Sequence, residues 1–420
     1  MTRRRIAVIG SGVAGLTAAY VLQREADVTL YEADSRLGGH AHTHEVLDDS
    51  GTSIRVDTGF IVHNERTYPQ LIRLFSELDI ATADSDMSMS VQCGGCGLQY
   101  AGARGLSGLF PSSRNVVNPR YLYLLTEVVR FQRAARALLA SDDGANRTVG
   151  EFVQAGHFTD YFRSHFLTPL IAAVWSTPPQ LTELYPVRYL FEFLQNHGML
   201  SISGSPQWRT VVGGSARYVE KAVKSLSAVL TSTPVRSVAR AGAGVTVRDD
   251  SDQLAQYDAA VIASHPAQAL SMLAAPTDAQ SHALGAIGYS KNPTILHTDT
   301  AVLPAARKAQ ASWNYFLPSC TATADSVHVS YDMNRLQNLP TDTRYLVTLN
   351  DDGAVRPDAI VERMQYEHPI ITPEAVAAQG ELAGLNDGVL AFAGAYHGWG
   401  FHEDGCRSGV DAARSLGVHW

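Results

Sequence analysis

Lysine is scarce in this chain of 420 residues, and so are cysteine and long apolar runs. The four lysines are Lys221, Lys224, Lys291 and Lys308, and no Gly-Lys-Ser/Thr sequence occurs, which excludes a Walker-type phosphate loop. Four cysteines are too few for a disulfide scaffold and suit a reducing compartment. No apolar run reaches the ~18 residues that a membrane-spanning helix needs. The sequence therefore predicts neither a disulfide-held nor a membrane-spanning fold.

Positive charge is also limited. The chain has 33 Lys and Arg against 41 Asp and Glu, a formal net charge of −8, and no basic run. Proteins that bind nucleic acids concentrate positive charge, so no nucleic-acid partner is expected. Arg3–Arg5 before an apolar segment is similar to the start of a signal peptide, but glycines interrupt that segment and a regular strand pattern follows. We interpret the N-terminus as part of the fold and expect a cytoplasmic location.

The first strongly patterned segment is a strand, a glycine turn, a helix and a second strand. Ile6–Ile9 is a short apolar run typical of a strand buried on both faces. Residues 10–15 (Gly-Ser-Gly-Val-Ala-Gly) follow, residues 16–24 have helical spacing, and residues 26–31 form a strand that ends at Glu32. This order is that of a dinucleotide-binding unit.

Each glycine of this unit, and the acid that ends it, has a physical role. Gly10 allows a tight turn, Gly12 lets a pyrophosphate approach the backbone, and Gly15 lets the helix lie close to the strand. The helix N-terminus attracts the phosphates, and Glu32 can accept hydrogen bonds from both ribose hydroxyls. Glu32 would repel a 2′-phosphate. A plain structural turn is the alternative interpretation, and the flanking strand, helix and acid favour dinucleotide binding.

The residues after Glu32 favour FAD over NAD. Arg36 and the pair Gly38-Gly39 add a guanidinium and backbone donors for the same pyrophosphate. Here the sequence resembles the two-dinucleotide-binding-domain flavoproteins, the superfamily of amine oxidases, phytoene desaturases and squalene-type desaturases. The resemblance extends to Asp57-Thr58-Gly59, which in that superfamily passes beside the flavin ring.

A second, independent resemblance lies at the C-terminus. Residues 392–413 (Phe-Ala-Gly-Ala-Tyr-His-Gly-Trp-Gly-Phe-His-Glu-Asp-Gly-Cys-Arg-Ser-Gly-Val-Asp-Ala-Ala) are similar to the closing flavin motif of the same superfamily. There a helix N-terminus faces the flavin, and its dipole stabilises negative charge on the ring. The alternative is a glycine-rich surface loop before a last helix.

A closer resemblance covers nearly the whole chain. Segments 56–69, 195–198, 206–215, 296–299, 313–315 and 400–405 are similar to a bacterial family of predicted NAD/FAD-binding proteins, often encoded beside cyclopropane-fatty-acid-synthase-like methyltransferases. The resemblance implies a strand in 229–238 that places Val235 on the adenine; an ordinary sheet strand is the alternative. The residues assigned to FAD by the motifs and the resemblance are Gly10, Gly12, Val13, Ala14, Gly15, Glu32, Ala33, Arg36, Gly38, Gly39, His40, Thr58, Gly59, Phe60, Ile61, Val235, Gly394, Phe401, His402 and Glu403.

The resemblance implies an α/β fold with a Rossmann-like FAD-binding domain and an α+β substrate domain. The FAD-binding domain is expected to be discontinuous, at 1–85, 205–270 and 385–420. The substrate domain is then built from 86–204 and 271–384. Its first part contains helical patterns at 118–139 and 149–196. Its second part contains strand patterns at 294–297, 312–316, 327–331 and 345–349.

No catalytic triad is needed, because a flavin carries out hydride transfer itself. In amine oxidases a lysine near flavin N5 holds a water and two aromatic side chains enclose the substrate amine; Lys291 and Phe401 are the nearest matches here. Candidate catalytic residues are His63, Lys291, Tyr366 and His402. Further candidates for the substrate face are Glu65, Arg66, Tyr68, Trp208, Arg209 and His368, each of which has a structural role as its alternative.

Two clusters contain residue types that bind metals. His40, His42 and His44 alternate, which would place three imidazoles on one face of a strand, but the flavin-proximal loop is the preferred explanation. Cys93-Gly-Gly-Cys96 is a single C-x-x-C with no partner pair, which argues against zinc and leaves a redox switch as the alternative. The sequence thus predicts no metal.

We expect an FAD-dependent oxidoreductase that moves a hydride between flavin N5 and an apolar lipid-, polyene- or terpenoid-like substrate. Desaturation, reduction and redox-neutral double-bond isomerisation all fit. The alternatives are amine oxidation and a non-catalytic FAD protein that assists a lipid-modifying methyltransferase. Because the expected substrate is an apolar small molecule, peripheral contact of the protein with a membrane surface is compatible with this expectation.

Overall fold

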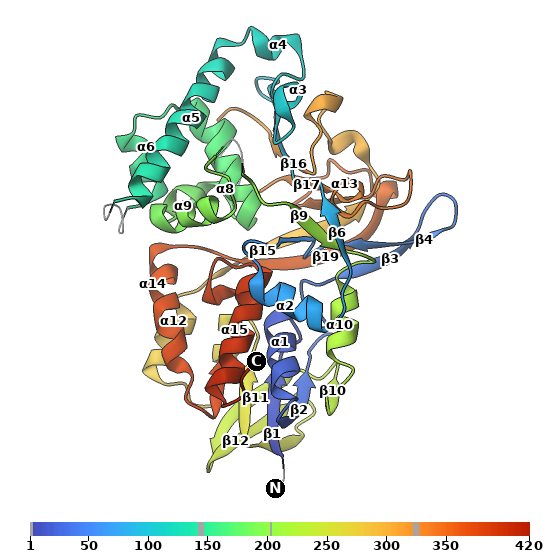
Figure 1. The fold of residues 1–420 in the computed structure, drawn as a ribbon, viewed down its shortest axis with the longest axis vertical. Coiled ribbons are helices and arrows are strands. Elements are labelled where there is room, and N and C mark those ends of the chain that lie inside the picture. The colour runs from blue at the N-terminus through green and yellow to red at the C-terminus, as the bar shows by residue number, and fades with distance from the viewer. Residues whose placement is uncertain (1–2, 142–146, 202–203, 322–326) are drawn as a thin grey trace.

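A five-stranded parallel sheet forms the centre of one half of the molecule in the computed structural model (Figure 1). The structure describes residues 3–141, 147–201, 204–321 and 327–420. The strand order is β10 (Ala228–Leu230), β2 (Ala26–Tyr31), β1 (Arg4–Ile9), β14 (Ala259–Ile262) and β20 (Leu390–Phe392). Strands from the start, middle and end of the chain therefore meet in one sheet, with β1 at its centre.

Alternating side chains of β1 enter two different cores. Ile6 and Val8 face α1 (Val13–Leu22) and α15 (His402–Ser415), whereas Ala7 and Ile9 face the opposite side. The two helices approach closely because a Cβ on Gly409 would lie 2.3 Å from the carbonyl oxygen of Ala14. The N- and C-terminal helices thus lie side by side beneath the site (Figure 1).

The opposite face of this sheet is covered by a small antiparallel sheet and three helices. The sheet has the order β11 (Val235–Ala241), β12 (Gly244–Asp249) and β13 (Leu254–Tyr257). The helices are α11 (Pro266–Met272), α12 (Asp278–Gly285) and α14 (Pro373–Leu382). Ala283 of α12 and Leu382 of α14 are buried in the same core as Ala7. Both helices lie in stretches that the sequence-based division gave to the substrate domain, yet they pack on the half that holds the parallel sheet.

The other half of the molecule contains a seven-stranded sheet. Its order is β19 (Ile360–Pro369), β15 (Tyr289–His297), β18 (Leu346–Leu349), β17 (Val329–Asp332), β16 (Trp313–Leu317), β7 (Met89–Cys93) and β8 (Gln99–Gly102). All neighbours are antiparallel except β16 and β7, which are parallel. β19 and β15 are the longest strands and pass over the top of the parallel-sheet half (Figure 1).

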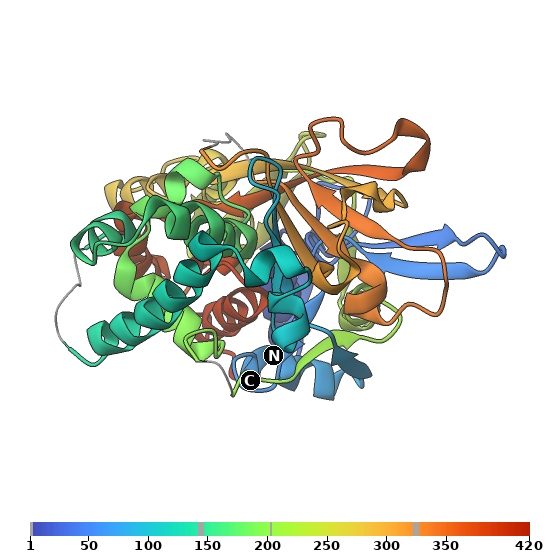
Figure 2. The ribbon, with the colours of Figure 1, turned by 90° about the horizontal axis from the view of Figure 1, so that it is seen from above.

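A helical cap stands beside the seven-stranded sheet, and Figure 2 shows cap and sheet next to each other from above. Its long helix α5 (Pro119–Leu139) begins at Asn118, whose side chain accepts hydrogen bonds from two backbone N–H groups. The remaining cap elements are α6 (Val149–Ala155), α7 (Asp160–Phe162), a π-helical turn η1 (Arg163–Leu167), α8 (Thr168–Trp175), η2 (Pro179–Leu184) and α9 (Val187–Asn196). Phenylalanines 131, 152, 158, 162 and 191 pack together in its core.

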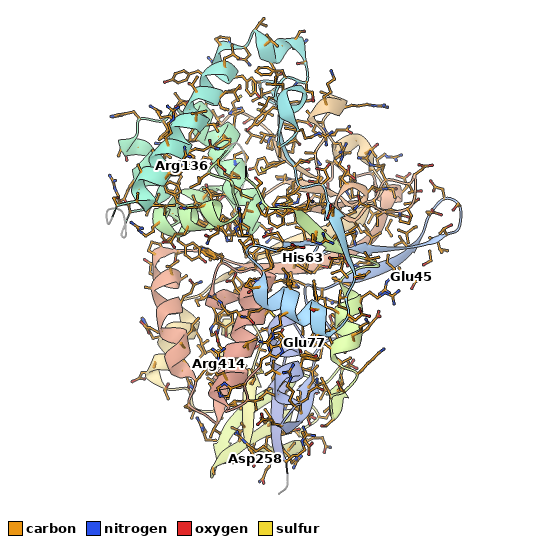
Figure 3. The ribbon with its side chains drawn as sticks, in the orientation of Figure 1. Glu45, His63, Glu77, Arg136, Asp258 and Arg414 are labelled. Atoms are coloured by element: carbon orange, nitrogen blue, oxygen red, sulfur yellow. The ribbon has the colours of Figure 1, made fainter. Side chains whose placement is uncertain are left out.

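Smaller elements connect the two halves. A projecting hairpin consists of β3 (Thr43–Leu47) and β4 (Ser53–Asp57), and a three-stranded sheet has the order β5 (Val62–Asn64), β9 (Trp208–Val211) and β6 (Thr82–Ser85). His63 of β5 lies at the junction between the halves (Figure 3). The other short helices are α2 (Pro69–Glu77), α3 (Gly105–Leu109), α4 (Ser113–Val116), α10 (Ala216–Ala222), α13 (Met333–Gln337), η3 (Thr300–Val302), η4 (Arg307–Ala309), η5 (Pro357–Ala359), η6 (Ala383–Leu385) and η7 (Ala395–His397).

The architecture confirms the predicted α/β fold class with an α+β second part, but two local expectations need correction. The segment 229–238 is two strands, β10 and β11, because a turn at residues 231–234 carries the chain from the parallel sheet to the antiparallel one. The three histidines do not share one strand, because β3 begins at Thr43 and includes only His44. Within the described residues, none of the helices is long and apolar enough to cross a membrane.

Candidate functional site

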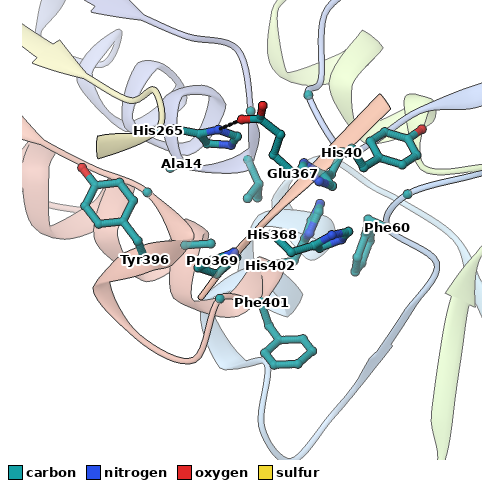
Figure 4. Close-up of a pocket in the computed structure, with 18 of the residues that line it drawn as sticks. Ala14, His40, Phe60, His265, Glu367, His368, Pro369, Tyr396, Phe401 and His402 are labelled. Atoms are coloured by element: carbon teal, nitrogen blue, oxygen red, sulfur yellow. Dashed lines mark hydrogen bonds and ion pairs between the residues drawn. The ribbon is translucent and has the colours of Figure 1, made fainter. Parts of the chain in front are cut away.

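A cavity of about 600 Å³ lies between the two halves of the molecule. It is lined by the glycine turn after β1, by the ends of β2 and β14, by β19, by the start of α15 and by the cap helices α8 and α9. Figure 4 shows part of the lining, with His40, Phe60, His368 and His402 grouped together and His265 close to Glu367. The cavity is therefore continuous from the dinucleotide-type turn to the aromatic cap.

The glycine turn leaves one end of this cavity open to an anion. Gly10 has φ +101°, and a Cβ on Gly15 would lie 1.9 Å from the carbonyl oxygen of Gly10, so both positions require glycine. A Cβ on Gly12 would meet nothing within 4 Å, and no side chain caps α1 at that residue. The uncapped N–H groups at the start of α1 therefore suit a pyrophosphate.

Glu32 sits at the end of β2, beside the same turn. Its Oε2 accepts hydrogen bonds from the backbone N–H of Ser11 at 2.9 Å and from Ser11 Oγ at 2.5 Å. Its Oε1 accepts one from the backbone N–H of Asp34 at 2.9 Å. A carboxylate has about four acceptor sites and three are used here, so the group is fixed in place and keeps about one site for a ribose hydroxyl. Val235, brought in by the turn between β10 and β11, lines the same end of the cavity.

The segment around Gly59 forms the middle wall. The backbone N–H groups of Thr58 and Phe60 donate to the carbonyl oxygens of His42 and His40, at 2.9 and 2.7 Å. A Cβ on Gly59 would lie 2.2 Å from the carbonyl oxygen of His40, so only glycine allows this approach. Pairing of these two segments places Thr58–Ile61 and His40 together on the cavity.

Two side chains near this wall have polar nitrogens without a hydrogen-bond partner among the described residues. They are Nε2 of His40 and Nη1 of Arg36, and both are buried. A buried polar atom without a partner costs ~1–3 kcal/mol, so both nitrogens fit a ligand with acceptor atoms. Burial and the neighbouring His368 lower the pKa of His40, so the imidazole is neutral and donates rather than carrying charge.

Tyr366 of β19 bridges the wall to the seven-stranded sheet. Its hydroxyl is 2.7 Å from Thr58 Oγ1 and 2.9 Å from His42 Nδ1, and its ring lies 5.1 Å from that of His40. Burial raises the pKa of Tyr366 to about 12, so the phenol stays protonated. Tyr366 can therefore fix the wall and present a phenol to the cavity.

The same wall continues into the C-terminal helix, because Phe60 stacks on His402 at the start of α15. The ring centroids are 3.7 Å apart with an interplanar angle of 14°. His402 Nε2 is 3.3 Å from the hydroxyl of Tyr218. Burial lowers the pKa of His402 to about 3, and the nearby His63 is a smaller cause of the same shift. Burial lowers the pKa of His63 to about 4, and this side chain lies behind the wall rather than on the cavity.

The N-terminus of α15 is capped from within. Asp404 Oδ2 accepts a hydrogen bond from the backbone N–H of Phe401 at 3.1 Å. The neighbouring Glu403 turns away from the cavity, because its two oxygens accept hydrogen bonds from the backbone N–H groups of Gln70 and Leu71, both at 3.0 Å. Glu403 therefore caps α2 and ties it to α15.

The structure brings most of the predicted cofactor residues together. Those that line the cavity are Gly10, Gly12, Val13, Ala14, Glu32, Ala33, Gly39, His40, Thr58, Gly59, Phe60, Ile61, Val235, Gly394, Phe401 and His402. Those behind the lining are Gly15, Arg36, Gly38 and Glu403. Of the catalytic candidates, Tyr366 and His402 line the cavity, whereas His63 and Lys291 do not.

Lys291 does not line the cavity. It is an exposed residue of β15, opposite Glu367 in the strand register. None of the four lysines, all of which are in the described part of the chain, lines the cavity. The match between Lys291 and the lysine of amine oxidases is therefore not supported by its position.

Several residues of the site carried no signal in the sequence. His265 follows β14, and its Nδ1 is 3.1 Å from Glu367 Oε2 of β19, while its ring stacks on Tyr289 at 4.1 Å. On the other side, Trp175 and Phe193 of the cap line the cavity with their ring centroids 4.6 Å apart. Only the packing of the cap over the parallel-sheet half reveals these residues as neighbours of the glycine turn.

Comparison with known proteins identifies the family. The family model described as flavin containing amine oxidoreductase matches residues 13–416. This chain belongs to that family. The chain is 28% identical over 278 residues to AofH of Mycobacterium tuberculosis, a predicted flavin-containing monoamine oxidase. That match covers 62% of this chain and 57% of the relative, so the comparison spans little more than half of the relative's length.

Solved structures share the fold over nearly the whole chain. Cyclohexylamine oxidase from Brevibacterium oxydans has a TM-score of 0.70 at 18% identity and covers 99% of this chain and 98% of its own. Putrescine oxidase has a TM-score of 0.67 at 16% identity, with 98% of both chains covered. A fatty acid isomerase from P. acnes that produces CLA has a TM-score of 0.66 at 14% identity, with 99% of both covered.

The family assignment establishes FAD as the cofactor. The residues present fit this cofactor: an uncapped helix N-terminus, an open approach at Gly12, a fixed carboxylate at Glu32 and unpartnered buried nitrogens on His40 and Arg36. The structural neighbours include amine oxidases and a fatty acid isomerase, so the shared fold leaves the substrate open.

Proposed function

We propose that this flavoprotein acts on an apolar, chain-like substrate, a lipid-, polyene- or terpenoid-like molecule, rather than on an amine. Bound FAD would accept a hydride from a substrate carbon, and loss of a proton from the adjacent carbon would then give a double bond. Where no proton is lost, return of the hydride to a different carbon would instead move an existing double bond without net redox change. The protein orients the chain and excludes water.

The observation that carries this proposal is the distribution of charge in the cavity. The lining contains no Lys, Arg or Asp among the described residues, and its two carboxylates are Glu32 and Glu367. Glu32 belongs to the glycine turn, and Glu367 is paired with His265. The part beneath the cap is therefore left without a carboxylate that would bind an ammonium group or a cation that would bind an acid.

His368 and His402 of the lining add no positive charge to the cavity near pH 7. Burial lowers the pKa of His368 to about 4 and that of His402 to about 3, so both are neutral near pH 7. The substrate side is lined instead by apolar and aromatic residues: Val62, Met87, Ala173, Val174, Trp175, Phe193, Met199, Trp208, Trp313, Tyr331 and Leu349. Apolar cavities of this size favour a ligand that loses its hydration on entry.

Amine oxidation is the second candidate, because AofH and cyclohexylamine oxidase carry that activity in their names. Trp175, Phe193 and Phe401 supply the observation that favours it. Phe401 is 4.9 Å from Phe193 and 6.1 Å from Trp175, between ring centroids. Such an aromatic cluster attracts a cation by ~0.5–2 kcal/mol. This is weaker than the ion pair that a carboxylate would supply.

A matched pair of ligands separates the two candidates. The methyl ester of a long unsaturated fatty acid and the primary amine with the same carbon chain are mixed anaerobically with the FAD-loaded protein, and flavin absorbance and products are followed. We expect bleaching of the flavin or a shifted double bond with the uncharged ester, and no reaction with the amine. Bleaching by the amine alone, with aldehyde as product, would show that the protein is an amine oxidase. No change with any member of a lipid and polyene panel would contradict the proposal.

A substitution in the cap gives a second test. Trp175→Ala removes a large apolar wall, and we expect KM for the chain-like substrate to rise about tenfold or more, since burying an aromatic side chain against a ligand contributes ~1.5–3 kcal/mol. Trp420→Ala is the control, because Trp420 packs on Tyr20 and Arg73 away from the cavity. Equal KM values in both variants would contradict the placement of the substrate beneath the cap.

A further inference from the structure

Cys93 and Cys96 do not stand alone in the fold, because Cys320 and His165 join them. The three sulfurs and Nε2 of His165 all lie within 4.8 Å of one another. Among the described residues, this is the one group of three or more His, Cys, Asp or Glu side chains that could hold a metal ion. The sequence could not show it, because the ligands lie 69 and 227 residues apart along the chain.

We propose that these four residues form a Cys3His site for a zinc ion that ties the helical cap to the seven-stranded sheet. None of the four lines the cavity, so the site is structural and does not depend on the proposed reaction. Four protein ligands complete the tetrahedral coordination of the ion, as in structural zinc sites, whereas catalytic zinc sites keep one position open.

The ligand spacing matches a tetrahedron around zinc. With Zn–S of ~2.3 Å and Zn–N of ~2.0–2.1 Å, regular geometry puts two sulfurs about 3.8 Å apart and a sulfur and a nitrogen about 3.5 Å apart. The Sγ atoms of Cys93 and Cys320 are 3.7 Å apart, and Cys96 Sγ is 3.5 Å from His165 Nε2. Two of the six ligand pairs are therefore already at the separation that a bound ion requires, and all six lie within 4.8 Å.

Three separate segments are shaped to bring the ligands together. Cys93 ends β7 opposite Leu317 of β16, which leads directly to Cys320. Between the first two cysteines, a Cβ on Gly94 would lie 2.8 Å from the carbonyl oxygen of Pro318, and one on Gly95 would lie 2.9 Å from the backbone nitrogen of Cys320. The two glycines thus allow the cysteine turn and the Cys320 segment to touch.

His165 is oriented by a second shell of the kind found at metal sites. It lies in the π-helical turn η1, a local irregularity that often marks a functional position. Its Nδ1 is 3.2 Å from the carbonyl oxygen of Tyr161 and 2.7 Å from Ser164 Oγ, so a proton on Nδ1 leaves Nε2 free to bind. Tyr161 stacks on the imidazole at 4.0 Å and fixes its plane.

The binding step balances in protons and in charge. Binding of Zn²⁺ replaces three thiol protons, which pass to solvent, and leaves a site with a net charge of −1.

The site would connect parts that enclose the cavity. η1 leads directly into α8, whose residues 173–175 line the cavity, and β16 carries Trp313, which lines it too. A zinc ion shared by the β7–β8 turn, β16 and η1 therefore fixes the cap against the sheet. The bound ion adds to the free energy of unfolding, because a chain that has lost the site binds it far more weakly.

Metal analysis of the full-length FAD-loaded protein tests the proposal. After expression with added zinc, we expect about one zinc per chain, loss of the ion in Cys96→Ser and Cys320→Ser, and full retention in Cys406→Ser. Cys406 is the matched control, because it is a buried cysteine in α15 beside Thr17, away from the cluster. Retained flavin colour shows that each variant is folded. Metal-free wild type, or zinc retained in both ligand variants, would overturn the proposal.

A measurement on the wild type keeps the test decisive if a variant fails to fold. Thiols are titrated with an organomercurial while released zinc is followed with a chromogenic chelator. We expect release to be complete once three thiols per chain have reacted. Cobalt exchanged into the site should give the visible bands of tetrahedral thiolate ligation. A disulfide between Cys93 and Cys320 in the freshly purified protein, found by mass spectrometry without reduction, would assign the cluster to redox chemistry and overturn the zinc site.

Discussion

The ring of Phe60 stacks on the imidazole of His402, with centroids 3.7 Å apart, and so joins the N-terminal flavin-type segment to the C-terminal helix. The two residues are 342 positions apart in the sequence, yet they form one wall of the cavity. Two motifs that are each weak alone thus meet in a single FAD site, which the family assignment supports.

Glu32→Ala is expected to weaken FAD binding. The change removes the acceptor that holds Ser11 and that faces the expected ribose position. Hydrogen bonds to a charged group are worth ~1.5–3 kcal/mol, so the Kd for FAD should rise about tenfold or more. Titration of apoprotein with FAD measures it. Glu25→Ala, an exposed acid just before β2, is the control, and equal occupancy in the two variants would count against the ribose assignment.

Gly12→Val is expected to give a folded but colourless protein. Gly12 has φ −63°, which valine adopts, and its Cβ direction is open, so the added side chain enters only the space expected for the pyrophosphate. Circular dichroism checks that the variant is folded, and the FAD-to-protein ratio checks that it has lost the cofactor. Gly285→Val, also with nothing within 4 Å of the added Cβ but on α12, should retain FAD. A yellow Gly12→Val protein would refute the placement of the cofactor.

Lys291→Met should leave turnover nearly unchanged. The lysine is exposed on β15 and does not line the cavity, so it cannot position a water on the flavin. Steady-state rates with any substrate that reduces the flavin, compared with wild type, provide the measurement. A loss of turnover by an order of magnitude or more would restore Lys291 to a catalytic role and favour amine oxidation.

The buried histidines are expected to make the fold sensitive to acid. Burial lowers the pKa of His402 to about 3 from a usual value near 6.5, so between these pH values the unfolded chain binds a proton that the folded chain does not. The free energy of unfolding therefore falls as the pH falls from about 6.5 towards 3. His42 and His63, with pKa values lowered to about 3 and about 4 chiefly by burial, act in the same direction.

A variant isolates the contribution of His402 to this pH dependence. In His402→Asn the group cannot titrate, so the loss of stability between pH 6.5 and 4 should be smaller than in wild type. Denaturant titrations of the FAD-loaded protein at several pH values give the slopes. His419→Asn, at an exposed position near the C-terminus, should keep the wild-type slope. Identical slopes in all three proteins would show that His402 is protonated in the fold.

Local patterns in the sequence were sufficient to predict the nucleotide end of the site. Strand, glycine turn, helix and terminal acid are adjacent along the chain, and their geometry follows from backbone sterics at Gly10 and Gly15. The predicted helix at 118–139 corresponds to α5, and the four strand patterns at 294–349 correspond to β15, β16, β17 and β18. The division into domains stays a prediction, as does the assignment of single residues to FAD.

What the sequence by itself determined is the family, the α/β class and the cofactor, because these depend on motifs of a few neighbouring residues. Tertiary structure decided everything that depends on distant segments. It turned Glu403 onto the N-terminus of α2, left Lys291 at the surface and brought His265 to Glu367. It also gathered Cys93, Cys96, His165 and Cys320 into one cluster, which the single C-x-x-C in the sequence could not predict. Side-chain direction and long-range packing set these outcomes, and neither is encoded in local spacing.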